Sequence, residues 1–158
     1  MSELTVLLHP DPRLKKICIP VTNIDKSIKK LCLDMIETMY KYSGVGLAAS
    51  QVGILKRVVV MDCSEEDEKK PIILINPEVI WSSDDISFFE EGCLSIPDIR
   101  EEIKRPSSVR IKFTDISGVL KEDFFEGLWA TCIQHEIDHL NGRLFICLLY
   151  TSPSPRDS

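Results

Sequence analysis

The chain lacks the sequence features that identify secreted and membrane-spanning proteins. Its six cysteines include no C-x-x-C pair and show no pattern of a secreted disulfide framework, which favours a reducing compartment. No apolar run is long enough to span a bilayer, and residues 1–13 contain no basic segment followed by an apolar one. We therefore expect a soluble intracellular protein with no membrane partner.

Positive charge is also scarce. The 19 Lys and Arg residues against 25 Asp and Glu residues give a formal net charge of -6, which argues against nucleic-acid binding through bulk charge. The 158 residues are 44% hydrophobic and 28% charged, enough apolar material for one globular domain with a core. This composition excludes a disordered chain, a coiled coil and a collagen-like rod.

Apolar residues at three- and four-residue steps predict two helices, each with one buried face. The first covers residues 23–42, and either Asn23 or Asp25 can cap its start. The second covers residues 127–140 and ends at Asn141-Gly142, a pair suited to a left-handed C-cap.

Short β-branched runs predict strands between the two helices. The runs at 57–62 and 72–75 flank an acidic loop, which predicts an antiparallel hairpin. Turn residues at 115–118 join two of the remaining strands, which are expected at 86–89, 109–114 and 119–124. The pattern indicates an α+β fold, in which antiparallel strands pack around the second helix and the other helix is N-terminal.

We expect a single catalytic domain over residues 1–146 and a short tail at 147–158. Residues 151–158 contain two prolines, three serines and no apolar side chain, so they cannot contribute much to a core. We expect this tail to be non-native or disordered.

The second predicted helix contains an H-E-x-x-H motif. His135 and His139 are four residues apart, which places both rings on one helix face where they can bind one metal ion. Glu136 can reach a water molecule on that ion and carry its proton. The alternative is that the histidines merely form a polar face, but the complete motif on a capped amphipathic helix favours the metal site.

A catalytic ion of this kind has three protein ligands and keeps one position for water. Downstream of the motif only Cys147 and Asp157 could supply the third ligand, so upstream residues must be considered. Cys93 lies in the segment EGCLS between two stretches of expected strand, beside a glycine that allows close backbone approach. The alternative for Cys93 is a small buried hydrophobic residue.

The segment GVGLAASQ at residues 44–51 matches the G-x-G-x-x-A form of a dinucleotide fingerprint. That fingerprint requires a strand before it and a long helix after it, whereas a helix precedes this segment and a strand follows within a few residues. The segment instead suits a loop beside an extended ligand, with Gln51 as an amide donor.

Taken together and in this order, GVGLAASQ, EGCLS and QHEIDH resemble the signature motifs of the peptide deformylase family. The resemblance extends from His9-Pro10 to Phe145. It implies removal of the formyl group from the N-terminal formyl-methionine of newly made polypeptides, with release of formate. It also implies roles for particular residues: Cys93, His135 and His139 as metal ligands, Glu136 as general base, and the Gln51 side chain and Leu94 N–H as the oxyanion site.

The resemblance also places Val45, Gly46, Glu91 and Gly92 along the substrate cleft and Arg100 at its rim. Leu128, Thr131 and Cys132 share the helix face that meets the metal, where an apolar methionine side chain could bind. The alternative for Leu128 and Cys132 is that they belong to the core.

The proposed ligands are compatible with Fe(II), Zn(II), Ni(II) or Co(II). The family resemblance implies ferrous iron in many members and zinc in others, so we expect Fe(II) as the native ion. We expect N-formylmethionyl peptides of nascent chains as partners, with a transient ribosome contact, although the chain shows no basic C-terminal helix for it. The bacterial cytoplasm is the expected location, for a bacterial or phage-encoded protein, and an organellar origin also fits.

Asp138, inside the motif, is expected to pair with Arg105 rather than to react. Two other functions fit parts of the pattern. One is an H-E-x-x-H metallopeptidase with a different third ligand, and the other is a non-catalytic metal-binding domain in which a residue such as Cys132 replaces the water.

Overall fold

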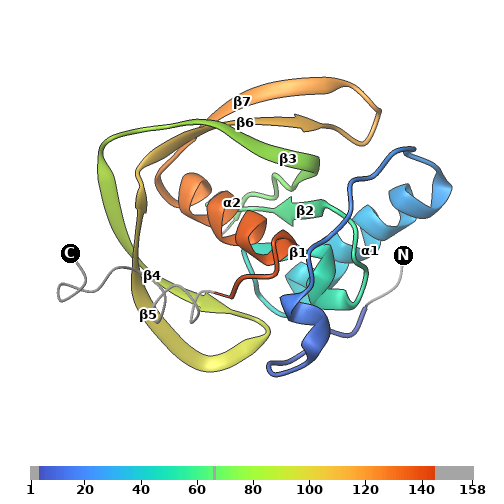
Figure 1. The fold of residues 1–158 in the computed structure, drawn as a ribbon, viewed down its shortest axis with the longest axis horizontal. Coiled ribbons are helices and arrows are strands. Elements are labelled where there is room, and N and C mark those ends of the chain that lie inside the picture. Colours follow the sequence, from blue (N-terminus) through green and yellow to red (C-terminus); the bar gives the residue numbers. More distant parts are fainter. Residues whose placement is uncertain (1–3, 66, 145–158) are drawn as a thin grey trace.

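The computed structural model describes residues 4–65 and 67–144, which form an α+β fold with antiparallel sheets (Figure 1). One sheet has five strands in the order β1-β2-β3-β6-β7, and the other consists of β4 and β5. The predicted α+β class is therefore confirmed. The elements in chain order are η1 Pro12–Lys15, α1 Lys26–Lys41, β1 Gly46–Ala48, η2 Ala49–Val52, β2 Val58–Met61, β3 Ile72–Ser82, β4 Ile86–Cys93, β5 Ile96–Pro106, β6 Ser108–Thr114, β7 Leu120–Glu126 and α2 Gly127–Leu140.

Helix α1 begins three residues later than predicted because Asp25 is its N-cap. The backbone at Asp25 is extended, and its carboxylate accepts a hydrogen bond from the N–H of Ile28 at 3.1 Å. The buried face of α1 includes Cys32, Met35 and Met39, which belong to one hydrophobic cluster with Val58 and Val60 of the sheet. The periodicity therefore identified the correct face of the helix.

The predicted hairpin between 57–62 and 72–75 is confirmed as the antiparallel pair β2 and β3, with Val60 opposite Ile73. Strand β3 continues to Ser82, beyond the predicted end. Its pairing with β6 shifts register after Ile75, where Asn76 adopts a left-handed φ of 54°. Pro77 has no backbone N–H to donate to the neighbouring strand. The register shift at Asn76 and Pro77 accommodates this missing donor, so the strand can continue.

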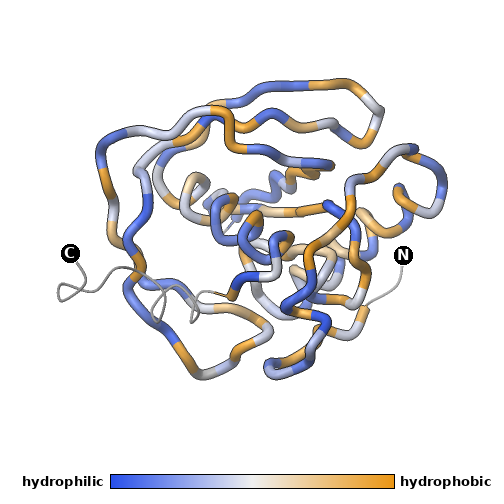
Figure 2. Tube along the Cα trace, in the orientation of Figure 1, coloured by the Kyte–Doolittle hydropathy of each residue, from blue (hydrophilic) through white to orange (hydrophobic). Residues whose placement is uncertain are grey.

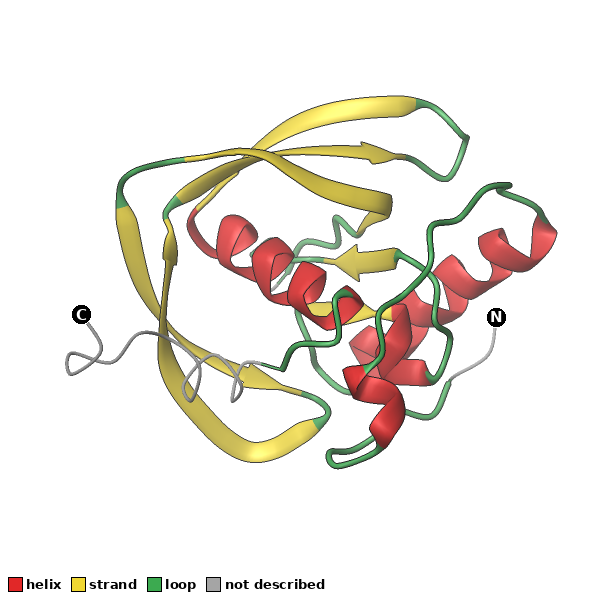
Figure 3. Cartoon of the chain, in the orientation of Figure 1, coloured by secondary structure: helices red, strands yellow, loops and turns green. Residues whose placement is uncertain are grey.

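The expected strand at 86–89 is longer in the structure and pairs with a strand that sequence reasoning missed. Strands β4 and β5 form a long antiparallel hairpin that curves beside α2 (Figure 3). Strand β5 was missed because its central residues are mostly charged and lack a β-branched run. The predicted strands at 109–114 and 119–124 are confirmed as β6 and β7.

The loop expected at 44–51 is instead the short strand β1 followed by the 3-10 helix η2. β1 pairs antiparallel with β2, with Leu47 opposite Val60. Sheet pairing through backbone groups therefore orders a segment whose small residues carry little strand preference.

Helix α2 packs against the five-stranded sheet and carries the H-E-x-x-H residues. Its apolar residues Ala130, Ile133 and Ile137 share a buried cluster with Val59 and Met61. Every residue of β2 is buried, and this strand forms a hydrophobic stretch at the centre of the molecule (Figure 2). Burial of each large apolar side chain contributes about 1.5–3 kcal/mol, so this contact holds α2 firmly in place.

The end of α2 follows the prediction. The helix stops at Leu140, and Gly142 adopts a left-handed φ of 76°. The Arg57 guanidinium donates hydrogen bonds to the Leu140 carbonyl oxygen at 3.2 Å and to Asn141 Oδ1 at 2.9 Å. Cationic donors at a helix C-terminus satisfy its last carbonyl groups and complement its dipole.

Among the described residues, no helix combines the length and apolar character that crossing a bilayer requires. The predicted tail at 147–158 lies outside the described residues.

Candidate metal centre

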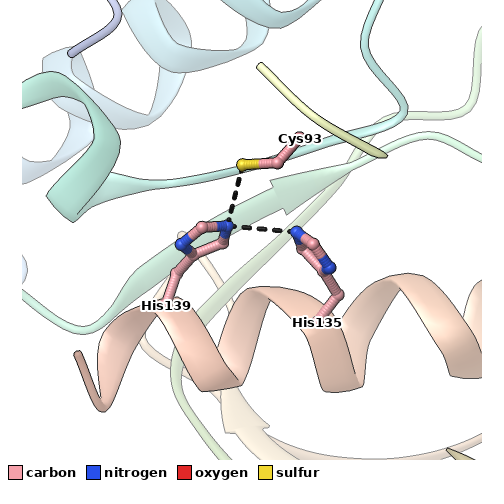
Figure 4. Close-up of side chains that lie close together, drawn as sticks. All are labelled: Cys93, His135 and His139. Carbon is pink, nitrogen blue, oxygen red and sulfur yellow. Dashed lines mark hydrogen bonds between the residues drawn. The ribbon is translucent and has the colours of Figure 1, made fainter. Parts of the chain in front are cut away.

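Three side chains from two elements converge on one point. Cys93 is the last residue of β4, and His135 and His139 lie one turn apart on α2. The Cys93 Sγ lies 3.2 Å from His139 Nε2, which lies 3.0 Å from His135 Nε2 (Figure 4). All three donor atoms lie within 4.8 Å of one another. Among the described residues, the upstream Cys93 therefore completes the cluster.

The donor set fits a divalent transition-metal ion. One sulfur and two imidazole nitrogens are the ligands that zinc and ferrous iron accept, and three protein ligands are the number found in catalytic sites. Among the described residues no fourth donor belongs to the cluster. Cys132, considered above as a fourth ligand, instead directs its thiol to the Val45 carbonyl oxygen at 3.6 Å.

The second ring nitrogen of His135 is held by Glu91. His135 Nδ1 lies 2.8 Å from Glu91 Oε1, an arrangement in which Nδ1–H donates to the carboxylate. Such a bond fixes the tautomer so that the lone pair on Nε2 faces the cluster. Sequence reasoning placed Glu91 only in the substrate cleft and missed this contact with a candidate ligand.

Arg105 on β5 links Glu91 to α2. Its guanidinium donates to both Glu91 oxygens, at 2.6 and 2.9 Å, and to Asp138 Oδ2 at 2.8 Å. The predicted pairing of Asp138 with Arg105 is therefore confirmed. Burial raises the pKa of Glu91, but the hydrogen bonds from His135 and Arg105 outweigh it and hold this pKa below its usual value. Glu91 therefore remains an anion beside His135.

Glu136 is a buried residue of α2 next to His135, and one of its carboxylate oxygens, Oε1, makes no hydrogen bond within the described residues. Burial raises the pKa of Glu136 to about 7. A carboxyl group that titrates near neutral pH can both accept and return a proton, as a general base requires.

The Gln51 amide is oriented by three contacts. Its Oε1 accepts a hydrogen bond from the Ala48 N–H at 2.9 Å, so the NH₂ group faces the other way. Nε2 then donates to Ser95 Oγ at 3.2 Å and to Cys93 Sγ at 3.4 Å. Sequence reasoning did not single out Ser95, although it lies within the EGCLS segment.

A cavity of about 850 Å³ opens beside the cluster. Among its lining residues are all those that the sequence assigned to the substrate cleft or to oxyanion binding, namely Val45, Gly46, Gln51, Glu91, Gly92, Leu94, Arg100, Leu128, Thr131 and Cys132. Leu128 is 43% exposed and faces the cavity rather than the core. Cys132 lines the cavity and is also a member of the buried core cluster. Tyr42 and Ile99 also line the cavity, and no motif marked them.

An α+β fold with a Cys/His/His cluster and a neighbouring buried glutamate is typical of hydrolases with a metal-binding site. The family model described as polypeptide deformylase matches residues 3–151. The chain belongs to this family of enzymes.

Individual relatives agree with the family match. A peptide deformylase from Afipia carboxidovorans is 51% identical over 158 residues, which cover 99% of this chain and 91% of that protein. The crystal structure of the peptide deformylase from Thermotoga maritima superposes with a TM-score of 0.88 at 43% identity, covering 93% of this chain and 97% of that one. A Met-Ala-Ser-bound class I type b peptide deformylase from Acinetobacter baumannii gives a TM-score of 0.88 at 36% identity, covering 92% and 98%.

Proposed function

We propose that this protein removes the formyl group from the N-terminal formyl-methionine of nascent polypeptides and releases formate. The observation that carries the proposal is the convergence of Cys93, His135 and His139 beside the buried Glu136, at the wall of a cavity large enough for a peptide terminus. The related Acinetobacter baumannii enzyme was crystallised with Met-Ala-Ser, a peptide that begins with methionine. The proposed catalytic domain spans residues 1–146, with α2 as its catalytic helix.

The proposed cofactor is one divalent ion held by Cys93, His135 and His139, with Fe(II) as the native ion and Zn(II) or Ni(II) as functional substitutes. When bound, such an ion acidifies a water molecule and polarises a carbonyl group. The contact from Glu91 to His135 orients one ligand for this ion, because Nδ1 binds the carboxylate and Nε2 points toward the cluster.

Glu136 is the proposed general base. It takes the proton of the attacking water and delivers it to the nitrogen of the leaving amine, so that the amide bond breaks without a covalent enzyme intermediate. A pKa of about 7, raised by burial, suits both transfers at neutral pH. The Gln51 Nε2 and the Leu94 N–H are the proposed donors to the developing oxyanion.

The methionine side chain is proposed to bind against α2, on the surface formed by Leu128, Thr131 and Cys132. An apolar wall suits an unbranched thioether, which adapts to irregular shapes. The substrate backbone is proposed to run beside Val45, Gly46, Glu91 and Gly92, with Arg100 at the rim.

The proposed partners are nascent chains carrying formyl-methionine, reached through a transient ribosome contact in the cytoplasm of a bacterium. A bacterial or phage-encoded origin fits this location, and an organellar one fits the same chemistry. We propose no nucleic-acid binding through bulk charge, since the net charge is -6, and no membrane partner.

Formate release from formyl-Met-Ala-Ser tests the proposal, with unformylated Met-Ala-Ser as the control substrate. We expect the metal-loaded protein to release formate and Glu136→Gln to reduce kcat at least about 100-fold while retaining the metal. Glu122→Gln makes the same change on exposed β7 and should leave kcat unchanged. Cleavage of the unformylated peptide, or an active Glu136→Gln variant, would contradict the proposal.

A further inference from the structure

Two cysteines that are not proposed metal ligands pack in the same contact between α2 and the sheet, and one of them, Cys132, lines the cavity. Cys63 lies just beyond β2, and Cys132 lies on α2. Both are free thiols. Cys132 belongs to the buried cluster between α2 and the sheet, and the partly buried Cys63 packs against that cluster.

Shared neighbours place the two sulfur atoms close together. The Cys63 Sγ lies 4.0 Å from the carbonyl oxygen of Leu128, the helical residue one turn before Cys132. Side chains on a helix lean toward its N-terminus, so the Cys132 side chain leans toward that same turn. The Val45 carbonyl oxygen accepts a hydrogen bond from the Cys132 thiol at 3.6 Å. It also accepts one at 2.8 Å from the N–H of Asp62, which is the residue before Cys63.

The electrostatics agree with this proximity. The Cys63 thiol and burial together raise the pKa of the Cys132 thiol well above its usual value. Cys132 is only 5% exposed, whereas Cys63 is partly accessible, so an oxidant from solvent reaches Cys63 first.

We propose that Cys63 and Cys132 form a reversible disulfide under oxidising conditions and that this bridge alters the cavity wall. With a peroxide as oxidant, the Cys63 sulfur attacks the peroxide oxygen, forming a sulfenic acid and releasing one water. The Cys132 sulfur then attacks the sulfenic sulfur, the S–S bond forms, and a second water leaves. Both thiols are oxidised and the peroxide is reduced, and an added dithiol reverses the reaction.

The bridge acts on the cavity because Cys132 forms part of its wall. The Cys132 Sγ packs so tightly against Gly46 that a Cβ atom at Gly46 would lie 2.6 Å from it. A bond toward Cys63 draws this sulfur out of that contact and fixes the residues after β2 against α2. If the cavity binds methionine as proposed above, KM rises while kcat changes little, because Glu136 is not modified.

The experiment uses the full chain loaded with Zn(II), so that peroxide finds no ferrous ion to oxidise. The reduced protein is treated with hydrogen peroxide, remaining thiols are alkylated, and digested peptides are mapped by mass spectrometry without reductant. We expect an intramolecular Cys63–Cys132 linked peptide that disappears with dithiothreitol. We also expect the KM for formyl-Met-Ala-Ser to rise about threefold or more, with recovery on reduction.

Two variants serve as controls. Cys63→Ser should abolish both the linked peptide and the KM response while keeping the activity of the reduced protein, and Cys147→Ser should keep both responses. Absence of the linked peptide, linkage through Cys93 instead, or a KM response that persists in Cys63→Ser would overturn the proposal. A linked peptide with unchanged KM would contradict the effect on the cavity. Failure of the proposed function is separate, since it would show as no formate release before oxidation.

Discussion

Gly46 occupies a position where the site has no room for a side chain. A Cβ atom there would lie 2.6 Å from Cys132 Sγ and 2.7 Å from Glu136 Oε2. Contacts this short force one of the neighbours to move. The close approach of β1 to α2 therefore depends on glycine and bears directly on the proposed general base.

We predict that Gly46→Ala lowers kcat/KM for a formylated peptide by about tenfold or more, because a displacement of Glu136 disturbs proton transfer. It should also destabilise the fold by about 1–3 kcal/mol through overpacking. Gly118→Ala is the matched control, since a Cβ there meets nothing within 4 Å, although its φ of 87° makes it a strained substitution. Gly118→Ala should lose some stability and keep its kcat/KM. Equal losses of activity in both variants would contradict the role of Gly46 beside Glu136.

Asp62 organises the start of the acidic loop between β2 and β3. Its carboxylate accepts hydrogen bonds from the Tyr40 hydroxyl at 2.5 Å and from the Ser64 and Lys70 N–H groups at 3.0 Å each. Burial raises the pKa of Asp62, but the hydrogen bonds from Ser64, Tyr40 and Lys70 outweigh it, so this pKa is lowered from 3.8.

A lowered folded-state pKa means that Asp62 stabilises the fold above pH 3.8 and that this contribution is lost as the pH falls through the folded-state value. We predict that Asp62→Asn lowers the free energy of unfolding by about 1.5–3 kcal/mol at pH 7. Urea denaturation of both proteins across the acidic range checks this prediction. The difference between them should shrink at low pH, and a difference that grows there would refute the assignment.

At the scale of elements, Arg105 joins the two-stranded sheet to the helix that carries the histidines. It lies on β5 and binds Glu91 on β4 and Asp138 on α2, while Glu91 in turn binds His135. One guanidinium therefore sets the position of β4 relative to α2. Lysine cannot reproduce these three directed hydrogen bonds.

We predict that Arg105→Lys weakens metal affinity by about 10- to 100-fold, because the orientation of His135 depends on Glu91. Competition with a chromophoric chelator measures this change. Arg110→Lys makes the same substitution at an exposed position of β6 and should retain the affinity of the original protein. Equal affinities in all three proteins would show that Arg105 has no role at the site.

The elements differ in how far the sequence predicted them. Helix α2 has the predicted bounds, because its apolar spacing and its end signals agree. Strand β5 was not predicted, since residues such as Glu101, Glu102 and Lys104 carry no strand preference and are held by pairing with β4. Pairing partners lie outside any local window of sequence, so such strands cannot be identified from local patterns.

At the scale of the whole molecule, the metal cluster links distant parts of the chain. Cys93 closes β4, whereas His135 and His139 belong to α2, so an ion bound to all three joins the two-stranded sheet to the core helix. An ion that binds only the folded state adds to its stability by mass action.

We therefore predict that removal of the metal lowers Tm and that added Zn(II) restores it. At a free metal concentration about 1,000 times Kd, the added stability is about 4 kcal/mol. Thermal unfolding with and without chelator measures the shift. Cys93→Ala should lose most of the metal-dependent shift, whereas Cys32→Ala should lose only metal-independent stability, since Cys32 lies outside the cluster. A full metal-dependent shift in Cys93→Ala would exclude Cys93 as a ligand.

The sequence by itself determined the α+β class, both helices and the two histidines of the candidate metal cluster, because these follow from local periodicity and from the H-E-x-x-H spacing. The ligand role of Cys93 was expected only from the family resemblance. The spacing of His135 and His139 predicts their common helix face without knowledge of the rest of the fold. Only the tertiary structure decided that Cys93 lies beside them, that Glu91 and Arg105 orient His135, and that Cys63 lies beside Cys132. These contacts join residues far apart in the chain, and their geometry depends on strand pairing and on the packing of α2 against the sheet.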